Sequence, residues 1–170
     1  GGGLLAIHSA SANERGQARF REFLGGAFER HYELQQSVPF SHVDRTHPAM
    51  ACMPEDYVWE QDEIYLNQPA DDVRPLLVLD WKDVNATSRA GDKYGCPQGG
   101  GHVLEWCKRY GQGRVYYTAL GHRPQDFGKM EWQLHLLNAA RWTMGELPDS
   151  VADDGAAKVR STLEGCELVA

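Results

Sequence analysis

Two histidines follow apolar runs whose composition is typical of buried strands. His8 comes directly after residues 4–7 (LLAI), and His122 ends the run RVYYTALGH. In open α/β sheets, ligands bind at the carboxyl ends of the strands. Both imidazoles are therefore expected at the binding edge of a sheet, where an imidazole can hold a metal ion or accept a proton.

The elements that must position these histidines are strands alternating with helices. Apolar and alternating patterns predict strands at residues 4–7, 38–43, 62–66 and 74–81, of which 4–7 and 74–81 are expected to be central and buried. Two alternating patterns around Gly111-Gln112-Gly113 predict a β-hairpin within residues 102–122. With the helices described next, this order predicts an α/β domain with a parallel or mixed sheet.

Two helices are predicted from apolar stripes at helical spacing. The first stripe comprises Phe20, Phe23, Leu24 and Phe28. Gly25-Gly26 interrupts it, so this helix is expected to stop there, and residues 27–31 are expected to form a separate turn. The second stripe comprises Leu134, Leu137, Ala140 and Met144, and its helix is expected to end at Gly145.

The composition favours one globular domain. The chain has 170 residues, of which 42% are hydrophobic, and its formal net charge is −7. Lysines and arginines are scattered singly, which argues against a nucleic-acid partner and against a polybasic membrane patch. No apolar run approaches the ~20 residues that span a bilayer. The glycine-rich and polar residues 85–101 are expected to form a surface loop.

The cysteines do not predict a metal or disulfide framework. The 4 cysteines contain no C-x-x-C pair and lie far apart, at Cys52, Cys96, Cys107 and Cys166. This spacing is poor for a zinc finger and too sparse for a disulfide scaffold. Buried or singly exposed thiols are expected, with a Cys96–Cys107 bridge as the alternative.

Several motifs, taken in order, resemble the ThuA-like domain family, which is named for trehalose utilisation. They are GGGLLAIHSA, FLGGAFERH, THPA, DEIY and GQGRVYYTALGH, and the resemblance extends over about residues 1–147. It implies a class I glutamine amidotransferase-like fold, which is a flavodoxin-like, three-layer α/β sandwich. Such domains normally begin with further strands and helices, so the resemblance also implies that N-terminal strands are missing from this chain.

The same motifs contain the residues that are expected to form the site. His8, His31 and His122 lie in three of them, and Glu63 of DEIY supplies a carboxylate. Imidazoles with a carboxylate suit Zn²⁺ or another divalent metal with an open position for water. His8, His31 and His122 are the expected metal ligands, and His8, Glu63 and His122 are the expected catalytic residues. The alternative is that the histidines line a sugar pocket by hydrogen bonding or are satisfied core residues.

The resemblance also bears on nucleophilic catalysis. The strand-to-helix turn that presents a cysteine nucleophile in glutamine amidotransferases reads Ile7-His8-Ser9 here, so amidotransferase chemistry is not expected. Ser9 is either a substitute nucleophile with His122 as its base or a cap of the following segment. The residues expected to contact substrate hydroxyl groups are Ser9, His31, Tyr65 and Thr118.

Three functions therefore stay open at the level of sequence. The first is a metal-assisted, hydrolase-like or sugar-modifying enzyme that acts on a carbohydrate or another small polar molecule. The second is a glycosidase, for which Glu63 and Asp80 are the available carboxylate pair. The third is a non-catalytic carbohydrate-binding or assembly module of a larger secreted multidomain protein.

Residues 148–170 are expected to be a linker. Their last part, AAKVRSTLEGCELVA, resembles the lead-in to the membrane-bound-dehydrogenase-like or haem-containing modules that follow ThuA-like domains in some large secreted bacterial proteins. This resemblance implies further domains in a longer parent chain and a periplasmic or secreted location.

Overall fold

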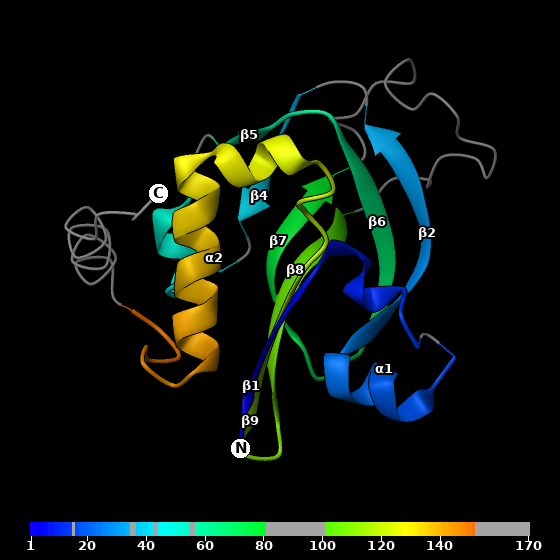
Figure 1. Cartoon of the computed structure of the whole chain (residues 1–170), viewed down its shortest axis with the longest axis vertical. Helices are drawn as coiled ribbons and strands as arrows, with labels where there is room; N and C mark the ends of the chain where they lie inside the picture. The colour runs from blue at the N-terminus through cyan, green and yellow to red at the C-terminus, as the bar shows by residue number, and fades with distance from the viewer. Residues whose placement is uncertain (15, 35–36, 43, 55–56, 81–100, 152–170) are drawn as a thin grey trace.

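A mixed five-stranded sheet forms the centre of the molecule (Figure 1). The computed structural model describes residues 1–14, 16–34, 37–42, 44–54, 57–80 and 101–151. The strand order of the sheet is β1-β9-β8-β7-β4. β1 pairs with β9 in parallel, and the other pairs are antiparallel. The strands are β1 (Gly3–Ile7), β9 (Gly113–Thr118), β8 (Gly101–Tyr110), β7 (Arg74–Asp80) and β4 (Ser41–His42).

A long antiparallel ribbon lies outside this sheet. It consists of β2 (Gly26–Leu34) and β6 (Asp62–Pro69), and a shorter pair consists of β3 (Val38–Pro39) and β5 (Val58–Trp59). Within the described residues, the α-helices are α1 (Ala18–Leu24) and α2 (Met130–Thr143). Short 3₁₀ turns are η1 (His8–Ser11), η2 (Met50–Cys52) and η5 (Pro124–Gly128).

The ribbon and α2 cover opposite faces of the five-stranded sheet. Neighbouring residues of a strand point to opposite faces. Tyr116 and Tyr117 of β9 therefore show which elements cover each face of the sheet. Tyr116 contacts His135 of α2, whereas the Tyr117 hydroxyl accepts a hydrogen bond from the Asn67 amide of β6. The three layers are therefore α2, the sheet, and the ribbon with α1, so a β-ribbon forms much of one outer layer.

Several predicted elements are confirmed. Residues 62–66 lie in β6, and residues 74–80 form β7, which lies between β8 and β4. The hairpin β8–β9 turns at the predicted glycines. α2 ends as expected, because Gly145 adopts φ 83 and its N–H bonds the carbonyl of Trp142. Residues 81–100, with most of the predicted surface loop, lie outside the described residues.

The predicted turn at residues 27–31 is wrong, because these residues belong to β2. α1 does stop at Gly25, whose φ of 84 suits glycine. From Gly26 onward the chain instead pairs with β6, with Ala27 opposite Gln68 and His31 opposite Tyr65. Pairing with a strand more than thirty positions away overrides the local pattern.

Two further strands differ from prediction. The expected strand at 38–43 is divided into β3 and β4, which pair with different partners, β5 and β7. Pro39 has no N–H to extend a ladder, which favours a short element here. β1 was expected to be central, yet it lies at the end of the strand order and only Ala6 of it is buried. The absence of earlier strands stays a prediction.

The largest fully buried side chains of the core are aromatic. Trp59, Trp106 and Trp132 are fully buried and Trp142 is nearly so. Trp81 lies outside the described residues. The indole N–H of Trp106 donates to the carbonyl of Leu24 at 2.8 Å and so fixes the end of α1 against β8. Cys107 is a buried free thiol, and Cys96, its partner in the alternative bridge, lies outside the described residues.

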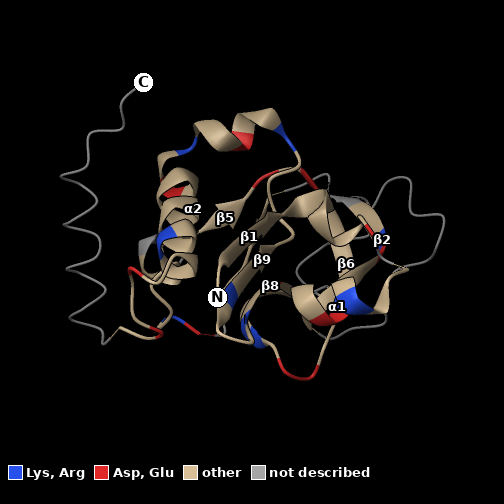
Figure 2. Ribbon diagram, turned by 60° about the horizontal axis from the view of Figure 1, so that its bottom comes forward, with Lys and Arg blue, Asp and Glu red and all other residues tan. Residues whose placement is uncertain are grey.

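The charged residues are distributed over several elements. Figure 2 shows lysines and arginines on α1, on α2 and along the central hairpin rather than on one face. Asp149 lies at the start of the predicted linker and bonds Arg109, Trp142 and, through its carbonyl, Arg74. None of the helices in the described ranges is long and apolar enough to cross a membrane.

Candidate functional site

The candidate site begins at the turn that follows β1. His8 is the first residue of η1 and has φ 47, in the left-handed region that residues with a Cβ rarely adopt. Its carbonyl oxygen accepts a hydrogen bond from the Tyr117 hydroxyl at 3.0 Å. That hydroxyl also bonds the Ser11 hydroxyl at 2.8 Å. Buried hydrogen bonds thus hold a strained turn, and such strain concentrates at functional sites.

The imidazole of His8 is buried against β6. Its Nε2 donates to the carbonyl oxygen of Glu63 at 3.1 Å. Its ring centroid lies 4.0 Å from that of Tyr65 and 5.0 Å from that of His122. Burial lowers the pKa of His8 below its usual 6.5, although the bond to Glu63 opposes this shift. His8 is therefore neutral at neutral pH, which is the form that binds metal ions.

The carboxylate of Glu63 lies among three imidazoles. Its Oε1 is 3.1 Å from His31 Nδ1, and its Oε2 is 3.3 Å from His122 Nδ1 and 3.7 Å from His8 Nε2. The exposed fraction of the side chain is 21% for Glu63, 43% for His31 and 49% for His122. The cluster is thus closed behind His8 and open to solvent at the other two histidines.

Three of the four side chains form a compact set of donor atoms. One donor each from His8, Glu63 and His122 lie within 4.8 Å of one another. His31 does not belong to this set, although it contacts the same carboxylate. Two imidazoles and a carboxylate are the donor types that Zn²⁺ and similar divalent ions prefer. The residues therefore fit a metal ion in the chemistry of their donors.

The register of two separate strand pairs produces this convergence. β1 and β9 run in parallel with Ile7 opposite Thr118, so their carboxyl ends meet at one edge and place His8 near the loop that carries His122. On the ribbon, Glu63 and Tyr65 are two positions apart on β6 and share a face. His31 lies opposite Tyr65 on β2 and so reaches the same place.

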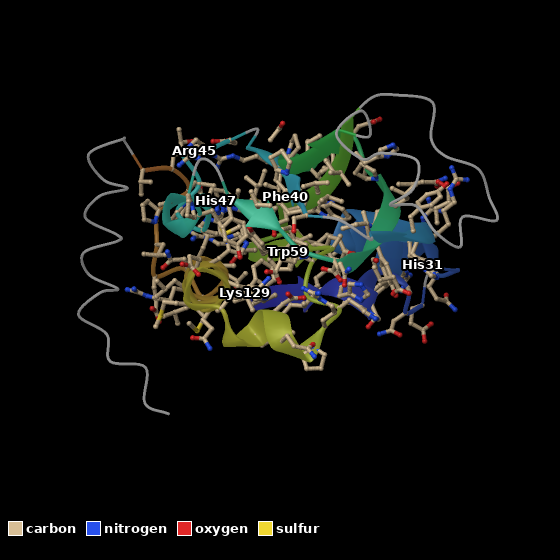
Figure 3. The ribbon with its side chains drawn as sticks, turned by 90° about the horizontal axis from the view of Figure 1, so that it is seen from above. His31, Phe40, Arg45, His47, Trp59 and Lys129 are labelled. Carbon is tan, nitrogen blue, oxygen red and sulfur yellow. The ribbon has the colours of Figure 1, made fainter. Side chains whose placement is uncertain are left out.

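Aromatic rings flank the cluster on the ribbon side. The ring centroid of Tyr65 lies 4.4 Å from that of Phe28, and the rings of Phe28 and His31 are stacked at 6.2 Å. Burial, followed by the Glu63 carboxylate, raises the pKa of Tyr65, so its hydroxyl keeps its proton. Figure 3 shows His31 on the ribbon, well away from His47.

The remaining predicted site residues lie outside the cluster. Ser9 is exposed in η1. Thr118 is fully buried, and its hydroxyl donates to Glu105 Oε1 at 2.6 Å, within the layer between β8, β9 and α2. The side chain of Asp80 lies outside the described residues, so no carboxylate pair with Glu63 can be described.

Comparison with known proteins identifies the family. The family model for ThuA, described as trehalose utilisation, matches residues 1–143. The chain belongs to the ThuA family. This confirms the resemblance seen in the sequence motifs. No curated protein matches the chain.

Solved ThuA-like proteins share this fold. One, from Bacteroides uniformis ATCC 8492, is 26% identical with a TM-score of 0.63, and the match covers 84% of this chain and 58% of that one. Another, from Parabacteroides merdae ATCC 43184, is 19% identical with a TM-score of 0.62, and the match covers 91% and 64% of the two chains. This ThuA-family chain therefore spans less than two thirds of the length of these structural relatives.

Sequence reasoning about this ThuA-family chain named Glu63 and assigned no role to its neighbour Asp62. Glu63 lies with the histidines, whereas Asp62 does not belong to the set of donor atoms. Asp62 is buried at 5% exposure and bonds the Trp59 indole instead. The alternation of side chains along a strand is the signal that distinguishes them, because neighbours on β6 must face opposite sides.

Proposed function

We propose that this ThuA-family chain holds a divalent metal ion with His8, Glu63 and His122 and acts on a carbohydrate as a hydrolase-like or sugar-modifying enzyme. The observation that supports this proposal most directly is the set of donor atoms within 4.8 Å of one another at the carboxyl ends of β1 and β9. A bound divalent ion would lower the pKa of a coordinated water and polarise a substrate oxygen.

The protein's own groups have distinct roles in this proposal. His8 is buried and its lowered pKa favours the neutral imidazole, which binds a metal ion through whichever ring nitrogen carries no proton. Glu63 provides the negative charge and is oriented by His31, whose Nδ1 lies 3.1 Å from Oε1. His122, half exposed, faces solvent and therefore the side from which a substrate would approach.

Carbohydrate is the proposed substrate class for two reasons. The family description is trehalose utilisation. In addition, the polar cluster adjoins the rings of Phe28, Tyr65 and His31. Sugars present hydroxyl groups at their edges and apolar C–H faces, so a site with polar groups beside aromatic rings suits them.

The metal is tested on the purified protein by calorimetric titration with Zn²⁺ after treatment with a chelator. We expect one Zn²⁺ per chain for the wild type, no saturable binding for His122→Ala, and unchanged binding for His102→Ala. His102 is the matched control because it lies on β8, outside the cluster. Failure of the wild type to bind Zn²⁺, Mn²⁺ or Fe²⁺ at micromolar concentration would refute the metal site.

Turnover is tested separately on a panel of disaccharides and oxidised sugars. Metal-dependent conversion that His122→Ala abolishes supports the enzyme. Sugar binding without conversion, unaffected by the chelator, would instead support the alternative of a non-catalytic binding module in a larger protein.

A further inference from the structure

Asp62 connects the two parts of the molecule that meet at the candidate site. It is the first residue of β6, on the ribbon, and its side chain is buried. Oδ2 accepts hydrogen bonds from the Trp59 indole N–H at 2.6 Å and from the Gly121 N–H at 3.3 Å. Oδ1 accepts from the N–H of Glu63 at 2.7 Å.

These bonds reach the backbone beside two proposed ligands. Glu63 is itself a ligand, and Gly121 directly precedes His122. Glu63 lies on the β2–β6 ribbon, whereas His122 follows β9 of the five-stranded sheet. One carboxylate thus bonds both segments and fixes their separation at the point where their side chains must converge.

The backbone conformation of Gly121 makes its hydrogen bond to Asp62 important. Gly121 has φ 92, a conformation that favours glycine, and a Cβ added there would lie 3.4 Å from both Phe127 and Trp132. The loop therefore turns sharply between β9 and His122. The Gly121 N–H donates to Asp62, and the orientation of His122 depends on the position of this turn.

A carboxylate suits this task better than its amide. Two carboxylate oxygens accept all three bonds, whereas the amide group of asparagine offers one accepting oxygen and a nitrogen that only donates. The three groups that donate to Asp62 are neutral, so they offset only in part the cost of burying its charge. The three hydrogen bonds orient the backbone at Glu63 and Gly121, while the burial of the charge lowers the free energy of unfolding.

We propose that Asp62 is a positioning residue of the candidate metal site, holding the Glu63 and His122 backbones at the separation that metal binding requires. The inference rests on the proposed function, and it does not make Asp62 a ligand. Groups that orient metal ligands without touching the metal typically change metal affinity by 10–100-fold when they are mutated.

The test compares Asp62→Asn with Asp44→Asn in the purified chain. Asp44 is the matched control, because its carboxylate accepts hydrogen bonds from Arg74, at the start of β7, and from Thr46, outside the cluster of His8, Glu63 and His122. We expect Asp62→Asn to weaken Zn²⁺ binding about 10–100-fold by calorimetry. Asp44→Asn should lower the melting temperature and leave the Zn²⁺ affinity within twofold of wild type. A folded Asp62→Asn protein with wild-type affinity would overturn the inference.

A second readout does not depend on metal. In the metal-free protein, Asp62→Asn should speed hydrogen exchange at the Gly121 amide and the Trp59 indole and shift the His122 resonances, and Asp44→Asn should do neither. If the wild type binds no metal, the proposed function fails, while these signals still decide whether Asp62 holds the two segments. Unchanged Gly121 and His122 signals would overturn the positioning role.

A second variant covers the case in which Asp62→Asn does not fold. Trp59→Phe keeps an aromatic ring in the core and removes the indole N–H that donates to Asp62 at 2.6 Å, together with part of the buried ring. We expect it to weaken Zn²⁺ binding by less than the roughly 10–100-fold expected for Asp62→Asn, because the carboxylate keeps its bonds to Glu63 and Gly121. Wild-type affinity in folded Trp59→Phe, together with an unshifted Gly121 amide, would contradict the inference.

Discussion

At the scale of single residues, backbone strain and candidate chemistry coincide at His8. Its φ of 47 places a side chain with a Cβ in a region that costs an ordinary residue roughly 1–2 kcal/mol. The bond from Tyr117 to its carbonyl and the bond from its own Nε2 to Glu63 offset this cost. The conformation directs the imidazole towards β6 rather than along the strand.

A pair of substitutions separates strain from chemistry at His8. We expect His8→Gly to be more stable to urea than His8→Ala by about 1 kcal/mol, because glycine accepts a positive φ without steric cost. Both variants should lose Zn²⁺ binding by calorimetry. A more stable His8→Ala protein would show that the positive φ is not a source of strain.

Glu63 offers a second prediction at this scale. Glu63→Gln removes the charge that three imidazoles share. We expect Zn²⁺ affinity to fall at least about 100-fold, since a neutral amide is a far poorer ligand than a carboxylate. The free energy of unfolding should change by less than about 1 kcal/mol, because the contacts of a partly exposed carboxylate contribute little to stability.

The control for Glu63→Gln is Glu60→Gln. Glu60 is exposed and pairs with Arg123 and Lys129, outside the cluster. Figure 3 labels Lys129 beside Trp59, and its ammonium lies 4.9 Å from the Trp59 ring. Glu60→Gln should therefore bind Zn²⁺ like the wild type. Equal loss of affinity in both variants would indicate a general effect of charge rather than a ligand.

At the scale of elements, the contact between β1 and α2 depends on the absence of a side chain. A Cβ added to Gly3 would overlap the backbone carbonyl of Thr143 at the end of α2. The strand that positions His8 is therefore packed directly against a helix backbone. Among the described strands, β1 pairs with β9 alone, and α2 packs against both of these strands.

This packing predicts the effect of a single methyl group. Gly3→Ala should destabilise the domain by about 1–3 kcal/mol in urea denaturation, the usual cost of overpacking. Gly2→Ala is the control, because nothing lies within 4 Å of a Cβ added there. Equal stability of the two variants would show that β1 and α2 separate easily.

At the scale of the whole molecule, buried histidines link stability to pH. His47 is fully buried, and its Nδ1 accepts the N–H of Ala49 at 3.2 Å. Burial, followed by the charges of Arg74 and His135, lowers the pKa of His47 to about 3. In the unfolded chain the pKa is close to 6.5, so the unfolded state takes up a proton first as the pH falls.

The sign of the resulting effect follows from this depressed pKa. The contribution of His47 to stability is complete above pH 6.5 and is lost progressively as the pH falls towards 3. We expect a loss of about 2 kcal/mol between pH 7 and pH 4.5 by urea denaturation. His47→Asn should flatten this profile over the same range. If the stability of His47→Asn fell as steeply with pH as that of the wild type, His47 would not be the source of the pH dependence.

The sequence by itself determined the elements whose signals are local. The hairpin β8–β9, the strand β7 and the helix α2 follow from residue periodicity and glycine turns, because these depend on neighbours in the chain. Placing His8 and His122 at the ends of strands came from the same reasoning. The ordered motifs also identified the ThuA family over most of the chain.

Only the tertiary structure brought Glu63 together with the three histidines. β2 was mistaken for a turn because its pairing with β6 is long-range and leaves no local pattern. That pairing fixes the face of β6, so Glu63 points to His31 while Asp62 turns inward to Trp59. Thr118 was predicted to contact substrate, but its hydroxyl donates to Glu105 in the core instead. Periodicity determines where strands lie, but the burial of one face against another decides which side chains share a site.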